Sequence, residues 1–322
     1  IYGRRIANTK ISSPPVFILG HWRSGTTLLH EYMMLDKRYT FPDTYMCYCP
    51  THFLLTQYFI RGLTSFLLPS KRPMDNVAFG WDRPQEDEFA LCNLGAKTPY
   101  LNIAFPNHPP EYQEYLDMNG LSDQEIEEWK SHLMHFVQTL TVQDSRPLIL
   151  KSPTHTGRVR QLLQIFPDAK FVHIHRDPYS VFPSTVNLWR RLTESQALQR
   201  PRNENLEEYV IENFKRMYRS YFESVGDIPK GQISEIGYQD LVDNPVGELQ
   251  RVYRDLNLGD FEPVRDSFES YAQQMQRFRT NQFELSDEIR ERIAQEWSFF
   301  IDCYGYTNEK SLAGTKLERV SS

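Results

Sequence analysis

The sequence of 322 residues lacks the features that are typical of disulfide-rich secreted domains and of membrane-spanning proteins. Four cysteines, Cys47, Cys49, Cys92 and Cys303, are too few and too scattered for the disulfide framework of a small secreted domain. No run of about 18 apolar residues could span a membrane, and no basic-then-apolar leader opens the chain. We therefore expect a cytoplasmic protein from a reducing compartment, without a membrane span.

An excess of basic residues is also missing. Lys and Arg number 36 against 42 Asp and Glu, for a net charge of −6 and a pI of about 5.9. A general nucleic-acid footprint is excluded, so any anion site must be a local cluster of Arg and Lys. Cys47-x-Cys49 with His52 has no second Cys/His pair, and we expect no metal site.

The bulk composition indicates one large domain rather than several small ones. The chain is 40% hydrophobic and 24% charged, with enough apolar material for a sizeable core. We divide it into an N-terminal arm at 1–14, a single domain with helical insertions at 15–306, and a polar tail at 307–322.

Short apolar runs alternate with helix-periodic segments along the domain. The runs predict buried strands at 16–19, 147–151, 170–175 and 232–238. Helices are expected after a capping box at Ser122, and at 155–166, 177–191, 206–225 and 286–302. This alternation predicts an α/β fold with a mostly parallel central sheet flanked by helices.

The stretch from Pro15 to Tyr32 reads as strand, glycine-bounded turn and helix, which is the architecture of a phosphate cradle. Its spacing Gly20-x-x-x-x-Gly25-Thr26-Thr27 nearly fits the nucleotide-binding loop G-x-x-x-x-G-K-[S/T]. The loop lysine is replaced by Thr26, and the basic residue is Arg23 instead. Losing that lysine disfavours a kinase or NTPase.

The loop resembles the 5′-phosphosulfate-binding loop of the sulfotransferases, which use 3′-phosphoadenosine 5′-phosphosulfate (PAPS) as donor. The residues that carry the resemblance, and that it implies as donor ligands, are Arg23, Ser24, Gly25, Thr26 and Thr27. The related enzymes of this kind are bacterial, carbohydrate and tyrosyl-protein sulfotransferases, and the resemblance implies their P-loop-like fold.

A second motif begins where the strand at 170–175 ends. Arg176 offers a bidentate fork to a phosphate, and Ser184 adds a hydroxyl two turns into the next helix. This segment resembles the 3′-phosphate-binding segment of the sulfotransferases. Together the two motifs describe a nucleotide with anions on both its 5′ and 3′ sides, as in PAPS, whose product would be 3′,5′-adenosine bisphosphate (PAP).

A third motif, Leu150-Lys151-Ser152-Pro153-Thr154-His155, resembles the central Lys-Ser-Pro or Lys-Thr-His segment of the family. Lys151 and Arg23 would neutralise charge on the leaving phosphate. Sulfuryl transfer also needs a base for the acceptor's hydroxyl proton.

Three candidates for that base are open. Asp43 lies where related enzymes carry a catalytic Glu, and we favour it. His155 suits the chemistry by its ordinary pKa but stands four residues after Lys151 rather than two. The cluster Glu86-Asp87-Glu88 reads more readily as a charged helix start.

Two later segments add donor-binding candidates. Tyr238 lies in a segment that resembles the family's Tyr-Glu-Asp-Leu stretch, and either contacts the adenosine or packs in the core. Arg277, with Arg279, lies where family members bring a basic loop over the 3′-phosphate. His173 and His175 alternate along a strand and are interpreted as structural.

The acceptor is not defined by sequence. Residues 52–68 are apolar and aromatic, and are either a packed helix or helical hairpin, or the wall of an acceptor pocket. A sugar, a lipid or a small-molecule alcohol would each fit. We interpret the chain as a PAPS-dependent sulfotransferase, with a P-loop-like small-molecule kinase and a non-catalytic nucleotide-binding protein as alternatives, and a homodimer left open.

Overall fold

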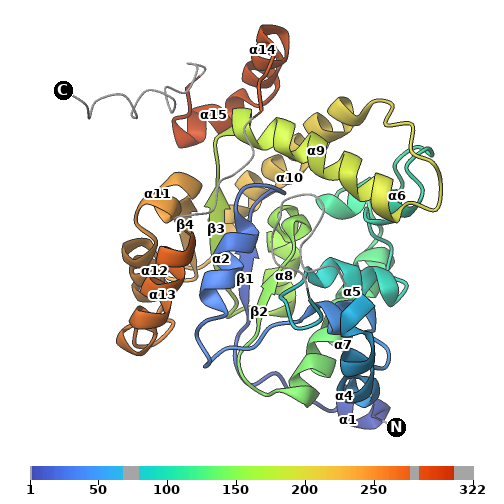
Figure 1. Ribbon diagram of the computed structural model, residues 1–322, viewed down its shortest axis with the longest axis vertical. Helices are drawn as coiled ribbons and strands as arrows, with labels where there is room; N and C mark the ends of the chain where they lie inside the picture. The colour runs from blue at the N-terminus through green and yellow to red at the C-terminus, as the bar shows by residue number, and fades with distance from the viewer. Residues whose placement is uncertain (1, 68–79, 276–282, 308–322) are drawn as a thin grey trace.

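A computed structural model describes residues 2–67, 80–275 and 283–307 (Figure 1). A sheet of four parallel strands runs in the order β2-β1-β3-β4. The strands are β1 (Val16–Leu19), β2 (Ile149–Lys151), β3 (Lys170–His175) and β4 (Ile233–Gly237). The predicted α/β class and parallel sheet are confirmed, and all four predicted strands form within two residues of their expected ends.

Helices make up most of the remaining described chain. The first half contains α1 (Gly3–Ala7), α2 (Thr26–Met33), α3 (Thr44–Tyr48), α4 (Phe53–Thr64), α5 (Asp87–Asn93), α6 (Leu101–Ala104) and α7 (Asp123–Gln143). The second half contains α8 (Val159–Ile165), α9 (Pro178–Gln196), α10 (Leu206–Ser224), α11 (Tyr238–Asp243), α12 (Pro245–Leu256), α13 (Glu262–Met275), α14 (Asp287–Glu296) and α15 (Ser298–Tyr304). Short 3₁₀ turns are η1 (Ser65–Leu67), η2 (Gln113–Leu116), η3 (Pro153–Arg158) and η4 (Val225–Asp227).

Each face of the sheet has its own hydrophobic core, because successive strand residues point to opposite sides. Phe17, Leu150 and Phe171 pack against the side formed by α7, α8, α9 and α10. Ile18 and Val172 pack against α2, α11, α12 and α13, which lie together on the other side (Figure 1). β1 is apolar throughout, whereas β3 and β4 carry polar residues such as His173 and Glu235 among their apolar ones.

Local signals account for several helix boundaries. Ser122 and Glu125 form the predicted capping box at the start of α7. The segment expected as one helix at 155–166 instead begins as η3, because Pro153 opens a tight turn before α8 continues. The helix expected at 286–302 is split at Trp297 into α14 and α15.

Two segments differ from simple expectation. The predicted arm contains α1, whose Ile6 is buried and which packs against α7. The apolar stretch after residue 52 forms α4 and η1, but α4 buries only Phe53 and Gln57 and is not the fully packed helix that was one alternative. Among the described residues, no helix is long and apolar enough to cross a membrane.

Gly157 gives a test of how tightly η3 is packed. A Cβ at this position would collide with the Leu116 carbonyl oxygen and lie 3.4 Å from Met217 Cα. Gly157→Ala should lower the free energy of unfolding by about 1–3 kcal/mol, because the backbone at Leu116 must move. Gly226→Ala, where a Cβ meets nothing within 4 Å, is the matched control and should change it by less than about 1 kcal/mol in urea unfolding. Equal effects of the two variants would contradict this packing.

Candidate active site

The turn between β1 and α2 has the backbone of an anion cradle. Gly20, Arg23 and Gly25 have φ values of 145°, 69° and 105°, in the left-handed region that glycine favours. Gly25 is the N-cap of α2, so no N-cap side chain occupies the first helical amides. The amide of Gly20 donates to Thr156 Oγ1 at 2.8 Å, which fixes the turn to η3.

The loop and the β3 motif form one cluster. Arg23 Nε donates to Ser184 Oγ on α9 at 2.9 Å, and Arg176 Nη1 donates to the Arg23 carbonyl oxygen at 3.1 Å. Two guanidinium groups that are 153 positions apart in sequence thus share one corner of the molecule. Had they been on opposite sides, no single nucleotide could have reached both.

Tyr238 joins the same corner at the start of α11. The Arg176 guanidinium lies over its ring, 4.1 Å from the centroid. A Cβ at Gly25 would collide with this ring, so the loop glycine is required for close approach of Tyr238. The predicted residues Arg23, Ser24, Gly25, Arg176, Ser184 and Tyr238 therefore lie together.

Arg176 is partly buried and has no ion pair in the part of the chain that the structure describes. Burial is the main cause that lowers the pKa of its guanidinium, because the charged form loses hydration. An anionic ligand would compensate that cost. The chemistry of this corner therefore fits a phosphate group.

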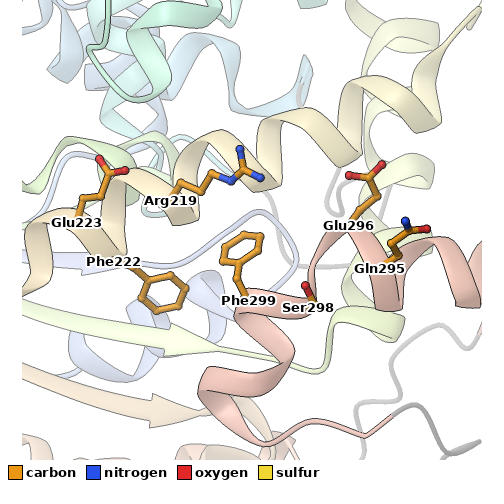
Figure 2. Close-up of a pocket in the computed structure, with 7 residues that line it drawn as sticks. All are labelled: Arg219, Phe222, Glu223, Gln295, Glu296, Ser298 and Phe299. Atoms are coloured by element: carbon orange, nitrogen blue, oxygen red, sulfur yellow. The ribbon is translucent and has the colours of Figure 1, made fainter.

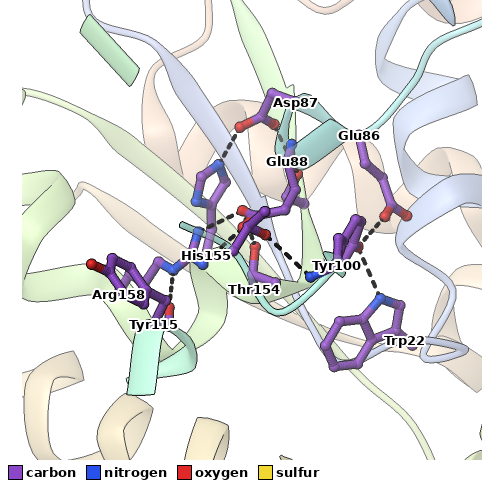
Figure 3. Close-up of polar contacts among 11 residues, drawn as sticks. Trp22, Glu86, Asp87, Glu88, Tyr100, Tyr115, Thr154, His155 and Arg158 are labelled. Atoms are coloured by element: carbon purple, nitrogen blue, oxygen red, sulfur yellow. Dashed lines mark hydrogen bonds and ion pairs between the residues drawn. The ribbon is translucent and has the colours of Figure 1, made fainter. Parts of the chain in front are cut away.

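Lys151 ends β2, and the parallel register places it beside Ile18 of β1, close to where the loop begins. Its side chain is buried, and Nζ donates to Glu86 Oε1 at 2.9 Å. Glu86 also accepts a hydrogen bond from the Tyr100 hydroxyl, which in turn accepts one from Trp22 Nε1 at 3.0 Å (Figure 3). The loop between β1 and α2 is thus linked to Lys151 through Tyr100 and Glu86.

The next two acidic residues have structural partners (Figure 3). Asp87 is buried and accepts from His155 Nε2 at 2.6 Å and from Ser152 Oγ at 3.1 Å. Glu88 is buried and paired with Arg158, whose Nη1 and Nη2 lie 2.6 and 3.0 Å from its two oxygens. Burial alone would raise the pKa of Glu88, but the charge and hydrogen bonds of Arg158 outweigh it and hold that pKa below its usual value.

His155 does not reach an open surface. The ring is fully buried, lies edge-on to Phe17, and donates to Asp87. Its Nδ1 meets no hydrogen-bond partner among the described residues. A proton acceptor needs access to the acceptor hydroxyl, and this geometry offers none.

Asp43, the favoured base, is the N-cap of α3. Its Oδ1 accepts from the Met46 amide at 2.9 Å, and its Oδ2 is 2.6 Å from Arg61 Nη2 of α4. Burial raises the pKa of Asp43, which Met46 and Arg61 offset only in part. Residues 42–44 pair with 83–85, so Asp43 and Glu86 come from neighbouring segments.

The strand histidines have structural contacts, in line with their interpretation. His173 Nδ1 lies 2.9 Å from Glu235 Oε1, and its ring stacks on Tyr221. His175 stacks on Tyr304, and burial lowers its pKa to about 4. Across the described residues, no group of His, Cys, Asp or Glu is arranged to hold a metal ion.

Two surface hollows lie away from these residues. The larger, of about 580 Å³, lies between α10 and the α14–α15 junction and is lined by residues such as Arg219, Glu296 and Phe299 (Figure 2). The smaller, of about 260 Å³, is bordered by Leu101 and Phe105 of the α6 region. Neither is lined by Arg23, Arg176, Ser184 or Tyr238.

The sequence did not indicate the roles of Tyr100 and Arg158, and two predicted residues lie outside the described part of the chain. Tyr100 is the N-cap residue of α6, and neither it nor Arg158 has a sequence spacing that signals its partners. Cys47, Cys49, Cys92 and Cys303 are all free thiols. Arg277 and Arg279 lie outside the described residues.

A glycine turn and helix start, two converging arginines and a buried lysine define a P-loop-like transferase of an anionic group. The profile of the Sulfotransferase family matches residues 14–263. The omega-hydroxy-beta-dihydromenaquinone-9 sulfotransferases Stf3 of Mycobacterium bovis and Mycobacterium tuberculosis are 43% identical over 306 residues, covering 95% of this chain and 79% of theirs. The chain belongs to the sulfotransferase family and is an enzyme that transfers a sulfuryl group.

Solved structures show the same fold. Sulfotransferase STF9 from Mycobacterium avium matches with a TM-score of 0.68 at 18% identity, covering 94% of this chain and 79% of that one. STF1 from Mycobacterium tuberculosis matches with a TM-score of 0.66 at 18% identity, covering 92% of this chain and 79% of that one. The predicted P-loop-like fold is confirmed.

The Glu88–Arg158 pair predicts a pH-dependent stability. Glu88→Gln should lower the free energy of unfolding by about 3–5 kcal/mol at pH 7, because Arg158 is left buried and uncompensated. Since the folded-state pKa of Glu88 is held below the ordinary value of 4.5, this advantage of the wild type is complete above pH 4.5 and is lost as the pH falls through the lower folded-state pKa.

Denaturant unfolding at a series of pH values measures the effect. Glu291→Gln, at an exposed position of α14, is the control and should stay within about 0.5 kcal/mol of wild type at every pH. A constant difference between wild type and Glu88→Gln down to strongly acidic pH would contradict the ion pair.

Proposed function

We propose that the sulfuryl donor is PAPS. The observation that carries this proposal is the contact network of Arg23, Ser184 and Arg176, which unites two anion-binding motifs in one corner. The amides of the loop and of the α2 start suit the 5′-phosphosulfate, while Arg176 and Ser184 suit the 3′-phosphate. Tyr238, stacked on Arg176, offers an aromatic face near the nucleoside.

In the proposed reaction the acceptor oxygen attacks sulfur in line with the bond to the 5′-phosphate. The new O–S bond forms as the S–O bond to phosphate breaks, and the electron pair leaves with PAP. Lys151 and Arg23 neutralise charge on the leaving phosphate, and the carboxylate of Asp43 or of Glu86 takes the hydroxyl proton. No metal has a part in this scheme.

The acceptor that the site supports best is a lipid-like alcohol. The relatives named above act on a hydroxylated menaquinone, as their name states. On α4 and η1, large apolar side chains point to solvent: Tyr58 and Phe66 are each 79% exposed and Phe59 is 74% exposed. Arg61 of the same helix contacts Asp43, so this face adjoins the acidic side of the site.

An apolar chain bound along α4 would bring its terminal hydroxyl toward Asp43 and Glu86. A free sugar would gain little from an uncharged face of this kind. We also propose a cytoplasmic location, which the four free thiols support because disulfides are rare in reducing compartments.

Donor binding is tested by calorimetry with PAP. Arg176→Ala should raise the Kd for PAP by about 10–100-fold, because a charge-assisted hydrogen bond to phosphate contributes about 1.5–3 kcal/mol. Arg254→Ala is the control, since this arginine has a side chain 72% exposed and lies on α12. An unchanged Kd in Arg176→Ala, or tighter binding of ATP with Mg²⁺ than of PAP, would contradict the assignment.

The acceptor class is tested with labelled PAPS and alcohols of different chain length. A Tyr58→Ser, Phe59→Ser double variant should raise KM for a long-chain prenyl alcohol by about tenfold or more, since each buried side chain contributes about 1.5–3 kcal/mol. Its KM for a short alcohol should be unchanged. Leu198→Ser removes an apolar side chain that is 77% exposed elsewhere and should alter neither value. Equal KM values for wild type and double variant with the long acceptor exclude α4 as its binding face.

A further inference from the structure

Glu86 differs from the two acidic residues that follow it. Asp87 and Glu88 are fully buried and occupied by His155 and Arg158, whereas the Glu86 side chain is 15% exposed. Glu86 is the N-cap residue of α5, with extended backbone, so it stands just outside the helix. The sequence suggested that all three residues form a charged helix start. In the structure Asp87 and Glu88 are held by buried partners, and Glu86 faces the site.

The partners of Glu86 belong to the reaction centre. Lys151, which we assign to the leaving phosphate, donates to Glu86 Oε1 at 2.9 Å. Tyr100 donates to Oε2 and accepts from Trp22 of the donor loop (Figure 3). A carboxylate this close to Lys151 is within one contact of the position that the sulfuryl group would take.

Asp43 is bound differently. One of its oxygens caps α3 through the Met46 amide, and the other binds Arg61, which holds α4. Both contacts are structural, and neither partner is a residue that we assign to the donor. Loss of the Asp43 charge would therefore disturb α3 and α4 before it disturbed the donor.

We propose that Glu86, rather than Asp43, is the proton acceptor for sulfuryl transfer. This inference rests on the proposed PAPS-dependent function. When the donor binds, the Lys151 ammonium moves from Glu86 Oε1 to the oxygens of the leaving 5′-phosphate, and Oε1 becomes free for the acceptor hydroxyl. The hydroxyl proton passes to Glu86 as the O–S bond forms and the S–O bond to the 5′-phosphate breaks. Tyr100 holds Oε2 throughout.

This exchange of partners would couple the two substrates. Without donor, the Lys151 ammonium occupies Glu86 Oε1, so that oxygen has no room for the acceptor hydroxyl. With donor, Lys151 contacts the leaving phosphate, and Glu86 Oε1 is open to the acceptor hydroxyl. The acceptor hydroxyl is therefore activated only when a sulfuryl group is present to receive it.

The first experiment compares Glu86→Gln, Glu86→Asp and Asp43→Asn with wild type, and with Glu291→Gln as a control. Glu86→Gln should lower kcat by about 10²–10⁴-fold, the usual contribution of a general base, while the Kd for PAP changes by less than about threefold. Glu86→Asp should recover part of kcat, and its rate should still fall at acidic pH, whereas the residual rate of Glu86→Gln should not. Asp43→Asn should lose thermal stability and less than about tenfold in kcat.

A double-mutant cycle distinguishes a proton acceptor from a residue that only positions Lys151. If Glu86 acts through Lys151 alone, Glu86→Gln has no further effect on kcat in a Lys151→Met background. If Glu86 takes the proton, the residual kcat of Lys151→Met falls again by about tenfold or more. The first result overturns the proposal and the second supports it.

Other outcomes are equally decisive. Near-normal kcat in Glu86→Gln, or a larger kcat loss in Asp43→Asn with PAP binding intact, overturns the proposal and returns the role to Asp43. Should Glu86→Gln fail to fold, two measurements on Glu86→Asp decide instead. They are the fall of its kcat at acidic pH and the double-mutant cycle that combines Glu86→Asp with Lys151→Met. A wild-type enzyme that neither binds PAP nor transfers sulfate from PAPS would instead refute the proposed function, so the two failures are distinguishable.

Discussion

The parallel pairing of β1 with β2 on one side and β3 on the other is the constraint on which the site depends. It brings the carboxyl ends of three strands together. The glycine loop follows β1, Lys151 ends β2, and Arg176 follows β3. Each connection between parallel strands must run back to the amino-terminal end of the sheet before the next strand begins. The residues at the carboxyl ends of these strands are therefore far apart in sequence yet adjacent in space. The change of direction on either side of β1 is where open α/β sheets bind their ligands.

The interior beside that edge is polar where most cores are apolar. Glu88, Arg158, Asp87 and His155 are all buried, which costs hydration energy that only close partners offset. Thr98 and Thr154 also donate to Glu88, so its oxygens are well satisfied. The consequence is geometric: α5 is locked to η3, and the residue before it is held next to Lys151.

The two sides of the site have opposite character. The side that we propose for the donor concentrates Arg23, Arg176 and Lys151 in a chain whose net charge is −6, so the positive potential is local. The acceptor side that we propose is apolar, and Arg61, the single charged residue of α4, contacts Asp43. In the proposed reaction, a charged nucleotide would therefore bind on the basic side and a hydrophobic alcohol on the apolar side, with their reacting groups close to Lys151.

Local patterns in the sequence determined the strands, the capping box of α7 and the anion-binding loop, because each depends on residues within one turn or one strand. The pairing of Arg23 with Ser184, and of Lys151 with Glu86, depends on strand order and on a buried network, which spacing does not encode. Pattern reasoning therefore read Glu86, Asp87 and Glu88 as one charged helix start. Only tertiary packing gave the three carboxylates separate environments, since burial and the choice of partner are set by segments 65 to 70 positions away.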